Sequence, residues 1–533
     1  MRRICLGRDA ASMAESVRLA YAESQEDEMM EPITAVSPSG DLRGKIRRGD
    51  SVIFYNIRGE REVELTRALM DPDFRHFARP GGLPGRMATM IEYEPGLPVR
   101  VAFPPIGAIP NTLGEVLSRH GLRQLRVVET EKAVHLSYFF NGKLSEAFPL
   151  EERLFVPSNR EVRNFDELPE MSAAEVAEVL QGKLREGRHP FVVGNFANVD
   201  VVGHLEREEP VRAAIQTVDR LAGLVVEEAR RQGYVTLLTA DHGTVEKRLY
   251  PDGTIDTGHS DSPVPLLLVP PGGTDAAVEL RQGGSLVDVA PTILDLFGIE
   301  APADMTGRSL LGAETSELRS QMFRRGEPRV LLLILDGWGH LPVREGNLLA
   351  QTPTPMMDRL MGSCPWVTLE AAGLAVGMPR GSVGNSESGH LHLGAGRVVP
   401  SDRVRIDDAI RSGAFGRNEA FRWAMEPARE TGEKALHLLG IVSFYSSHGS
   451  LDHLFALMDM ARSSGVRKLF IHCLLGRRGE RPESGRVYVG QVEKKAEDLG
   501  LGEVVTVMGR YWAMDREHNW DRVEKAYRAL TGD

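Results

Sequence analysis

The sequence predicts an α/β fold with mostly parallel sheets flanked by helices. Three features predict it: apolar runs of strand length, helical patterns between them, and acidic or imidazole side chains where the runs end. Segment 210–233, with apolar residues at helical spacing, is typical of the expected helices. The clearest strands are expected at 51–57, 124–130, 191–196, 235–241, 264–270, 330–335, 436–442, 468–475 and 503–508.

Composition limits the classes of protein that the chain can represent. Its 533 residues exceed one ordinary domain, and its 42% hydrophobic and 26% charged residues are typical of a globular protein. The net charge of −11 argues against nucleic acid or an anionic membrane as the main partner. Three scattered cysteines give neither a disulfide framework nor a zinc spacing, and no apolar run could span a bilayer. We expect a reduced, cytoplasmic protein.

Acidic and imidazole side chains occur where strands are expected to end. Each alone also fits a structural role, such as a turn, a helix cap or a surface pair. Together they point to one site, because the carboxyl ends of parallel strands meet at one edge of a sheet. Mixed oxygen and nitrogen ligands suit Mn²⁺ or Zn²⁺ better than Ca²⁺, and a metal-bound serine can be a nucleophile. The set is Asp200, His204, Asp241, His242, His259, Asp336 and Ser386.

A second set of residues is basic. Arginine clusters are commonly solvated surface, but arginine also grips carboxylate and phosphate groups with two parallel hydrogen bonds. A basic pocket in an acidic protein would fit a small phosphorylated acid. The set is Arg58, Arg61, Lys132, His448, Arg478, Arg510 and Arg516.

Several segments together resemble a known family. They include "LDGWG", "GNSESGH", "GAGR", "GRYWAMDR", "ETEK", "NFANVDVVGH" and "TADHG". The combination resembles the cofactor-independent (2,3-bisphosphoglycerate-independent) phosphoglycerate mutases of the alkaline phosphatase superfamily, over nearly the whole chain. The order differs, however. In that family "DGWG" lies near the N-terminus and the "ADHG" region near the C-terminus, whereas here "TADHG" comes first.

The resemblance therefore implies a circular permutation. The chain would begin in the family's middle, reach the family's C-terminal end near Leu311, cross a linker at 313–329 and restart at the family's N-terminus. It also implies two α/β domains, with hinges near 101–107 and 400–402. A transferase-like, substrate-binding domain would comprise 1–100 and 402–533, and a phosphatase-like, metal-binding domain 108–312 and 330–400.

The resemblance also implies roles for individual residues. Ser386 would be the nucleophile that takes the phosphoryl group, and Lys132 would neutralise developing charge. The implied reaction interconverts 3-phosphoglycerate and 2-phosphoglycerate through a phosphoserine. Of two Mn²⁺ or other divalent ions, one would be bound by Asp200, His204 and His259, and the other by Asp336, Ser386, Asp241 and His242. The phosphoglycerate would be held by His448, Arg478, Arg510, Arg516, Arg58 and Arg61.

The loops expected to handle the glycerate depart from the family's pattern. "FYSSHGS" at 444–450 keeps only His448 of the family's Asp-Gly-Gly-Val-His-Ser-His, and Gly479 replaces an aspartate. Thr244 stands where the family usually has asparagine. Two alternatives to a mutase therefore stay open: a related metal-dependent phosphatase or phosphomutase for another small phosphate ester, and a non-catalytic binding protein. The resemblance favours a monomer.

Overall fold

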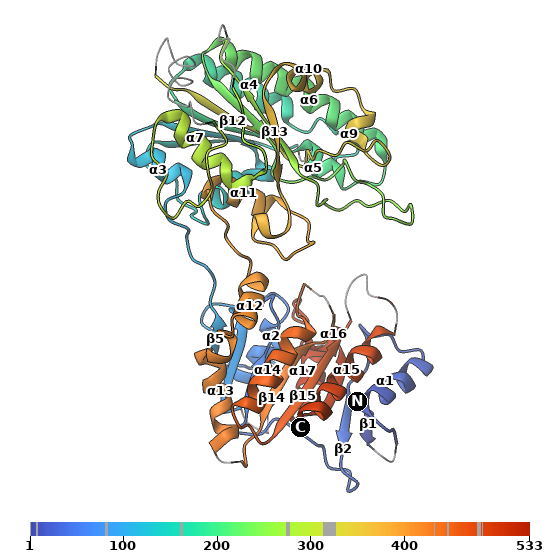
Figure 1. Cartoon of the computed structure of the whole chain (residues 1–533). Helices are drawn as coiled ribbons and strands as arrows, with labels where there is room; N and C mark the ends of the chain where they lie inside the picture. The colour runs from blue at the N-terminus through green and yellow to red at the C-terminus, as the bar shows by residue number, and fades with distance from the viewer. Residues whose placement is uncertain are drawn as a thin grey trace. The chain divides into compact units, whose positions relative to one another are not determined.

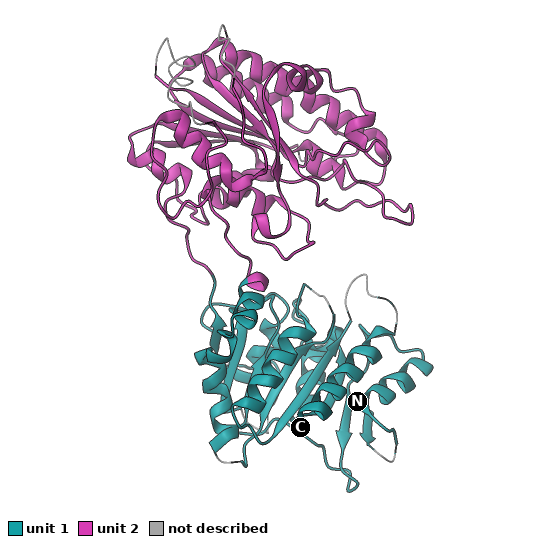
Figure 2. Cartoon of the chain, in the orientation of Figure 1, with its two compact units in different colours: residues 1–105, 405–533 teal, residues 106–404 magenta. Residues whose placement is uncertain are grey.

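The chain divides into two compact units, each assembled from segments far apart in the sequence. The computed structural model describes residues 2–6, 9–79, 84–159, 162, 164–272, 278–312, 327–430, 432–444, 447–476, 481 and 483–532 (Figure 1). Unit 1 comprises residues 1–105 and 405–533, and unit 2 comprises 106–404 (Figure 2). The expected linker at 313–329 lies outside the described residues, except for 327–329.

Unit 2 is built on a sheet of eight described strands in the order β11-β13-β10-β9-β12-β8-β6-β7. β10 runs against its neighbours β9 and β13, and the other described pairs are parallel. β12 lies between β8 and β9, so a strand late in the sequence completes the centre of a sheet begun by earlier ones. The strands are β6 (Gln124–Glu129), β7 (Glu151–Val156), β8 (Phe191–Phe196), β9 (Val235–Thr239), β10 (Val264–Val269), β11 (Gly284–Ser285), β12 (Val330–Leu335) and β13 (Trp366–Glu370).

Helices cover the unit 2 sheet in two packed groups. One group contains α4, α5, α6, α9 and α10, and the other contains α3, α7 and α11 (Figure 1). A one-turn π-helix, His135–Phe139, follows the 3₁₀ turn Thr130–Lys132. The helices are α3 (Leu113–Arg119), α4 (Ala173–Glu186), α5 (Asn198–Gly203), α6 (Glu208–Arg231), α7 (Val289–Phe297), α9 (Leu348–Gln351), α10 (Pro355–Ser363) and α11 (Ser386–Ala395).

Unit 1 has a second sheet of eight described strands, in the order β1-β2-β16-β15-β14-β3-β4-β5. Six neighbouring strands, β16, β15, β14, β3, β4 and β5, are parallel. β2 pairs antiparallel with β16, and β1 pairs with the other side of β2. The strands are β1 (Arg2–Cys5), β2 (Ile33–Val36), β3 (Ser51–Phe54), β4 (Arg86–Ile91), β5 (Arg100–Phe103), β14 (Leu436–Ile441), β15 (Leu469–Leu475) and β16 (Glu503–Gly509).

The helices of unit 1 also form packed groups. α1 and α14 pack against α15, α2 and α16 pack against α17, and α13 packs against β3, β4 and β5. Both chain ends lie in this unit (Figure 1). The helices are α1 (Met13–Ala22), α2 (Val63–Met70), α12 (Asp402–Arg411, at the border with unit 2), α13 (Glu419–Glu430), α14 (Leu451–Ser463), α15 (Ser484–Leu499), α16 (Arg510–Ala513) and α17 (Trp520–Thr531).

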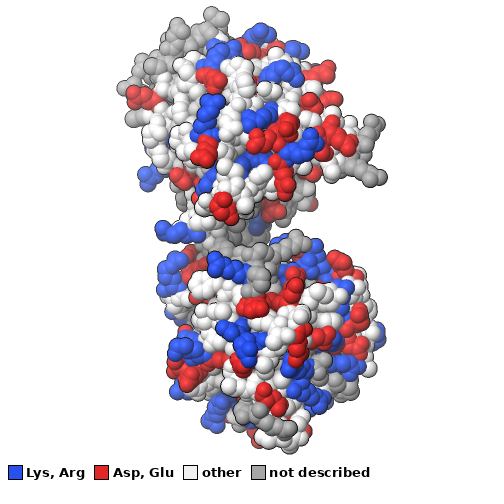
Figure 3. Space-filling model, turned by 90° about the vertical axis from the view of Figure 1, so that its right-hand side faces the viewer, with Lys and Arg blue, Asp and Glu red and all other residues white. Residues whose placement is uncertain are grey.

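The predicted fold class is confirmed, since both units are mostly parallel sheets flanked by helices. Every residue of β8, β9, β12 and β14 is buried, as expected for central strands with both faces covered. Within the described residues, no helix is long and apolar enough to cross a membrane. On the face shown in Figure 3, acidic and basic side chains are interspersed over each unit.

Candidate active site

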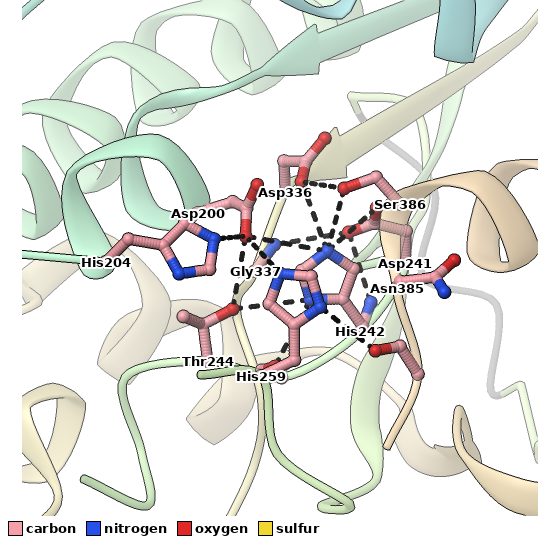
Figure 4. Close-up of polar contacts among 12 residues, drawn as sticks. Asp200, His204, Asp241, His242, Thr244, His259, Asp336, Gly337, Asn385 and Ser386 are labelled. Atoms are coloured by element: carbon pink, nitrogen blue, oxygen red, sulfur yellow. Dashed lines mark hydrogen bonds and ion pairs between the residues drawn. The ribbon is translucent and has the colours of Figure 1, made fainter. Parts of the chain in front are cut away.

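The chemistry-bearing side chains of unit 2 lie at one edge of its sheet, beyond the carboxyl ends of the parallel strands. Asp336 directly follows β12, and Asp241 follows β9 by two residues. Asp200 lies on α5, the short helix that begins two residues after β8. Because β10 is antiparallel, His259 reaches the same edge from the segment before that strand (Figure 4).

Ser386 is the first residue of α11, so its hydroxyl lies at a helix N-terminus. Asn385 caps the helix: its side chain accepts a hydrogen bond from the Ser388 backbone N–H at 2.8 Å. The cap fixes the first turn, and the exposed backbone N–H groups and the helix dipole favour an anion there. An anionic group bound at Ser386 would benefit from this field.

Lys132 connects the serine to two carboxylates. Its buried Nζ lies 2.6 Å from Ser386 Oγ, 2.6 Å from Asp200 Oδ2 and 2.9 Å from Asp336 Oδ1. His242 Nε2 approaches Ser386 Oγ at 3.0 Å. The hydroxyl is therefore held between an ammonium group and an imidazole in a site that excludes most water.

Three histidines surround Asp200. Its Oδ1 lies 3.0 Å from His259 Nε2, 3.4 Å from His204 Nε2 and 3.7 Å from His242 Nε2 (Figure 4). The Nδ1 atom of each ring faces a backbone carbonyl group: Thr257 O for His204, Gly243 O for His242 and Gly384 O for His259. A carbonyl fixes Nδ1 as the protonated nitrogen and turns the Nε2 lone pair inward, which is the arrangement of histidine metal ligands.

The charges of the site shift the pKa values of its members strongly. Burial would lower the pKa of His242, but the Asp241 and Asp200 carboxylates raise it to about 10. Burial would likewise lower the pKa of Lys132, yet Asp336 and Asp200 hold it above its usual value. Burial would raise the pKa values of Asp200 and Asp336, but His242 and Lys132 keep both well below the usual range. Without a metal ion, the His242 ring therefore carries a proton on both nitrogens at neutral pH.

The donor set fits divalent cations. The ligand atoms of Asp200, His242 and His259 lie within 4.8 Å of one another, and so do those of Asp241, His242 and Asp336. His204 lies outside the first of these groups, although its Nε2 is close to Asp200. Asp241 Oδ2 is buried and, within the described part of the chain, has the His390 and His242 rings at 3.2 and 3.4 Å but accepts no well-aligned hydrogen bond, which leaves it available to a cation. Carboxylate and imidazole ligands suit Mn²⁺ and Zn²⁺.

The structure adds residues to which sequence reasoning gave no role. His390 Nδ1 lies 3.2 Å from Asp241 Oδ2, and Asn195 Nδ2 donates to Asp336 Oδ2 at 2.9 Å. Thr244 Oγ1 lies 3.3 Å from His242 Nδ1 and 3.4 Å from Asp200 Oδ1. The spacing of His390 four residues after Ser386 was a usable signal, because such residues share a helix face. Asn195 gave none, since it lies inside an apolar strand.

Five of the six basic residues predicted to hold a substrate are described by the structure, and they lie in unit 1, beyond the carboxyl ends of its parallel strands. Arg58 Nη2 and Arg516 Nη1 bind different oxygens of Glu60, at 3.1 and 2.8 Å. Arg61 Nη1 donates to Met514 O at 3.2 Å. The buried His448 lies 3.1 Å from Glu62 through its Nδ1. Arg510 follows β16 directly and faces Glu28, and Arg478 lies outside the described residues.

Comparisons with known proteins agree with this chemistry. The model of the metalloenzyme superfamily matches residues 19–301, which is more than half of the chain. The chain belongs to the metalloenzyme superfamily. The site of this metalloenzyme lies within that match, apart from Asp336 and the residues at the start of α11. Residues 406–533 match a model described as the N-terminus of BPG-independent phosphoglycerate mutase.

Several curated relatives of this metalloenzyme share a name. The chain is 42% identical to the 2,3-bisphosphoglycerate-independent phosphoglycerate mutase of Moorella thermoacetica, over 57% of this chain and 58% of that protein. It is 41% identical to the Gloeobacter violaceus protein of the same name, over 58% and 57%. A crystal structure of Leishmania mexicana phosphoglycerate mutase is 29% identical over 58% of each chain, with a TM-score of 0.38. The chain thus spans less than two thirds of the relatives it matches.

Membership of the superfamily and the two ligand clusters together support divalent metal binding.

Proposed function

We propose that this chain interconverts 3-phosphoglycerate and 2-phosphoglycerate through a phosphoserine at Ser386, in a site with two divalent ions. One observation carries the proposal: Ser386 Oγ is held at 2.6 Å from Lys132 Nζ and 3.0 Å from His242 Nε2, among three buried carboxylates. The names of the relatives supply the substrate. An active enzyme is therefore favoured over a non-catalytic binding protein.

In the proposed reaction Ser386 Oγ forms a bond to phosphorus while the bond to the glycerate oxygen breaks. The glycerate leaves with a proton, and its other hydroxyl later takes the phosphoryl group back from Ser386. Lys132 holds the serine oxygen and neutralises negative charge on the transferred group. When bound, divalent cations would favour the serine alkoxide and polarise the phosphoryl oxygens.

The proposed metal ligands are Asp200, His204 and His259 for one ion and Asp336, Ser386, Asp241 and His242 for the other. We propose Mn²⁺ for both, and the oxygen and nitrogen donors would accept related divalent ions.

The proposed partner of unit 1 is the phosphorylated acid itself. Arg58, Arg61, Arg510, Arg516 and His448 are its proposed ligands among the described residues, with Arg478 as a further candidate from the sequence. Glu60 accepts a hydrogen bond from Arg58 on one oxygen and from Arg516 on the other. The carboxylate of a bound acid could bind the same two guanidinium groups in this way. The monomeric state, the cytoplasmic location and the absence of nucleic-acid and membrane partners stay predictions.

We also propose that the chain is a circular permutation of the mutase order. Two observations support it. A model described as an N-terminus matches the last residues of this chain, 406–533, and β12 completes a sheet whose neighbouring strands come earlier in the sequence. Residues 313–329 would then join the original chain ends.

One observation favours a second function, a metal-dependent phosphatase or phosphomutase for another small phosphate ester. Phe444, three residues beyond Ile441 at the end of β14, is 70% exposed near the basic residues, where an apolar ring is a poor partner for a glycerate hydroxyl. Altered handling of the glycerate would let water take the phosphoryl group.

³¹P NMR of 3-phosphoglycerate, incubated with the full chain and Mn²⁺, separates these functions. Growth of a 2-phosphoglycerate signal to equilibrium supports the mutase. Release of inorganic phosphate alone supports the phosphatase and contradicts the mutase. An unchanged spectrum with Mn²⁺ bound contradicts both for this substrate.

A further inference from the structure

A buried carboxylate, Glu62, lies among the basic residues that follow the parallel strands of unit 1. It immediately precedes α2 and is fully buried. Its Oε1 accepts hydrogen bonds from Asn56 Nδ2 at 2.6 Å and His448 Nδ1 at 3.1 Å, and its Oε2 accepts one from the Arg61 backbone N–H at 3.1 Å. The Asn56 amide and the Arg61 N–H are donors, and His448 is a third donor in the tautomer that carries its proton on Nδ1.

The contacts of Glu62 join loops that follow different strands. Asn56 follows β3, and its Oδ1 accepts a hydrogen bond from the backbone N–H of Ile441 at the end of β14, at 2.8 Å. The Ile57 N–H donates to His448 O at 2.7 Å. Arg61 Nη1 donates to Met514 O, beyond β16. Glu62 is therefore the acceptor at the centre of three loops that carry the candidate anion ligands.

A negative side chain at a site for anions needs a reason. Its charge repels a phosphorylated ligand, and its burial costs solvation that only hydrogen bonds can offset. The benefit must come from the groups that it orients. A carboxylate on Nδ1 fixes the tautomer and the orientation of an imidazole, and so determines how Nε2 is presented.

We propose that Glu62 is the positioning residue of the anion site in unit 1. It holds the proton of His448 on Nδ1, which fixes how Nε2 is presented to the ligand, and it orders the Arg61 segment, so that a phosphorylated acid meets a preoriented ring and a prearranged guanidinium donor. This inference rests on the proposed function of unit 1 and assigns Glu62 no contact with the ligand.

The sign of one binding change tests the proposal. Glu62→Gln keeps the shape, removes the charge and turns an N–H₂ group toward donors. If the charge of Glu62 acted only by repulsion, the variant would bind 3-phosphoglycerate more tightly. Positioning predicts the opposite, an affinity about tenfold weaker, because a buried hydrogen bond to the ring or the loop is lost. Isothermal titration of the full chain with 3-phosphoglycerate, and with inorganic phosphate as a second probe, measures this.

Glu64→Gln is the matched control. Glu64 lies on α2, is 4% exposed and accepts the His518 backbone N–H at 2.9 Å, away from His448. The variant removes the same charge from nearly the same place. Its affinity for 3-phosphoglycerate should therefore stay within about twofold of the affinity of the parent chain. An equal loss in both variants would overturn the proposal.

A second readout is independent of any ligand. In ¹⁵N NMR, at a pH where the His448 ring carries a single proton, that proton should lie on Nδ1 in the parent chain, and Glu62→Gln should change the ring-nitrogen shifts. A parent ring protonated at Nε2 would overturn the proposal, even if the variant failed to fold. In a His448→Gln background Glu62→Gln should add little to the loss of affinity, since the two act through one contact. A parent chain that binds neither anion would refute the proposed function, while the tautomer would still decide the role of Glu62.

Discussion

The hydroxyl of Ser386 should be indispensable for phosphoryl transfer. Ser386→Ala removes the atom that Lys132 and His242 hold but leaves the Asn385 cap of α11 in place. We expect turnover of 3-phosphoglycerate with Mn²⁺ to fall at least about a thousandfold, with an unchanged circular dichroism spectrum. Ser363→Ala, at the end of α10, should keep the parent rate. Parent-like turnover in Ser386→Ala would refute the phosphoserine.

Metal binding should release a proton from His242. The pKa of its ring is raised from 6.5 to about 10 in the metal-free site, whereas a ring that binds a cation through Nε2 must be neutral. At pH 8 we expect about one proton released from this ring, and weaker Mn²⁺ binding as the pH falls. Calorimetry in buffers of different ionisation enthalpy measures the protons. Identical heats across buffers would contradict the prediction.

The same shift fixes the sign of a stability change. The pKa of His242 in the folded, metal-free chain lies above its unfolded value, so the charged ring stabilises that fold fully below pH 6.5. This contribution is lost as the pH rises toward 10. The melting temperature of the metal-free chain should therefore fall between neutral and alkaline pH, and saturating Mn²⁺ should reduce that fall.

Residue patterns predicted which residues belong to the candidate site better than they predicted the contacts of those residues. Asp336 and Asp241 were visible because each comes within two residues of the end of an apolar run, and parallel strands end together. Asn195 was invisible, because a polar residue inside an apolar run does not reveal which face it occupies or what it meets. The burial of Glu62 also could not be foreseen, since an acidic residue before a helix is ordinarily solvated.

Elements were predictable where an apolar run was continuous. The strand expected at 191–196 is β8, and the one expected at 264–270 is β10. The antiparallel direction of β10 was not predictable, because an apolar run does not reveal the direction of the neighbouring strands, here β9 and β13. β5 lies inside the proline-rich segment 98–111, where a short, partly exposed edge strand gives little apolar signal.

The close approach of α11 to the Asp241 segment should be essential for metal binding. A Cβ at Gly389 would collide with the Asp241 carbonyl oxygen and lie 2.7 Å from Asp241 Cβ. Gly389→Ala must move the helix or the carboxylate, so we expect Mn²⁺ affinity to fall about tenfold or more by calorimetry. Gly362→Ala in α10, where nothing lies within 4 Å, should bind Mn²⁺ normally and be up to about 1 kcal/mol more stable. Normal Mn²⁺ binding by Gly389→Ala would show that this packing does not position the site.

At the scale of the whole molecule, chain order and fold are separable. Each unit combines segments from distant parts of the sequence: β14, β15 and β16 share a sheet with β1 to β5, and β12 completes a sheet begun by β6 to β9. The sequence could suggest this arrangement only through its order of motifs, because strand adjacency across hundreds of residues leaves no local pattern. Packing within each sheet depends on which strands meet, and the connection affects mainly the entropy of closing loops.

Reordering the gene should therefore preserve the protein. We would place residues 330–533 first, follow them with a short Gly/Ser linker and residues 1–312, and omit 313–329. Every described strand pairing can form in this chain, and both ends to be joined lie in unit 1 (Figure 1). We expect a change in unfolding free energy of about 1–2 kcal/mol, with unchanged Mn²⁺ binding and turnover of 3-phosphoglycerate. Denaturant unfolding, calorimetry and ³¹P NMR measure these quantities. A reordered chain that does not fold would refute the permutation, whereas one that folds without turnover would show that the altered loops, and not the chain order, determine the activity.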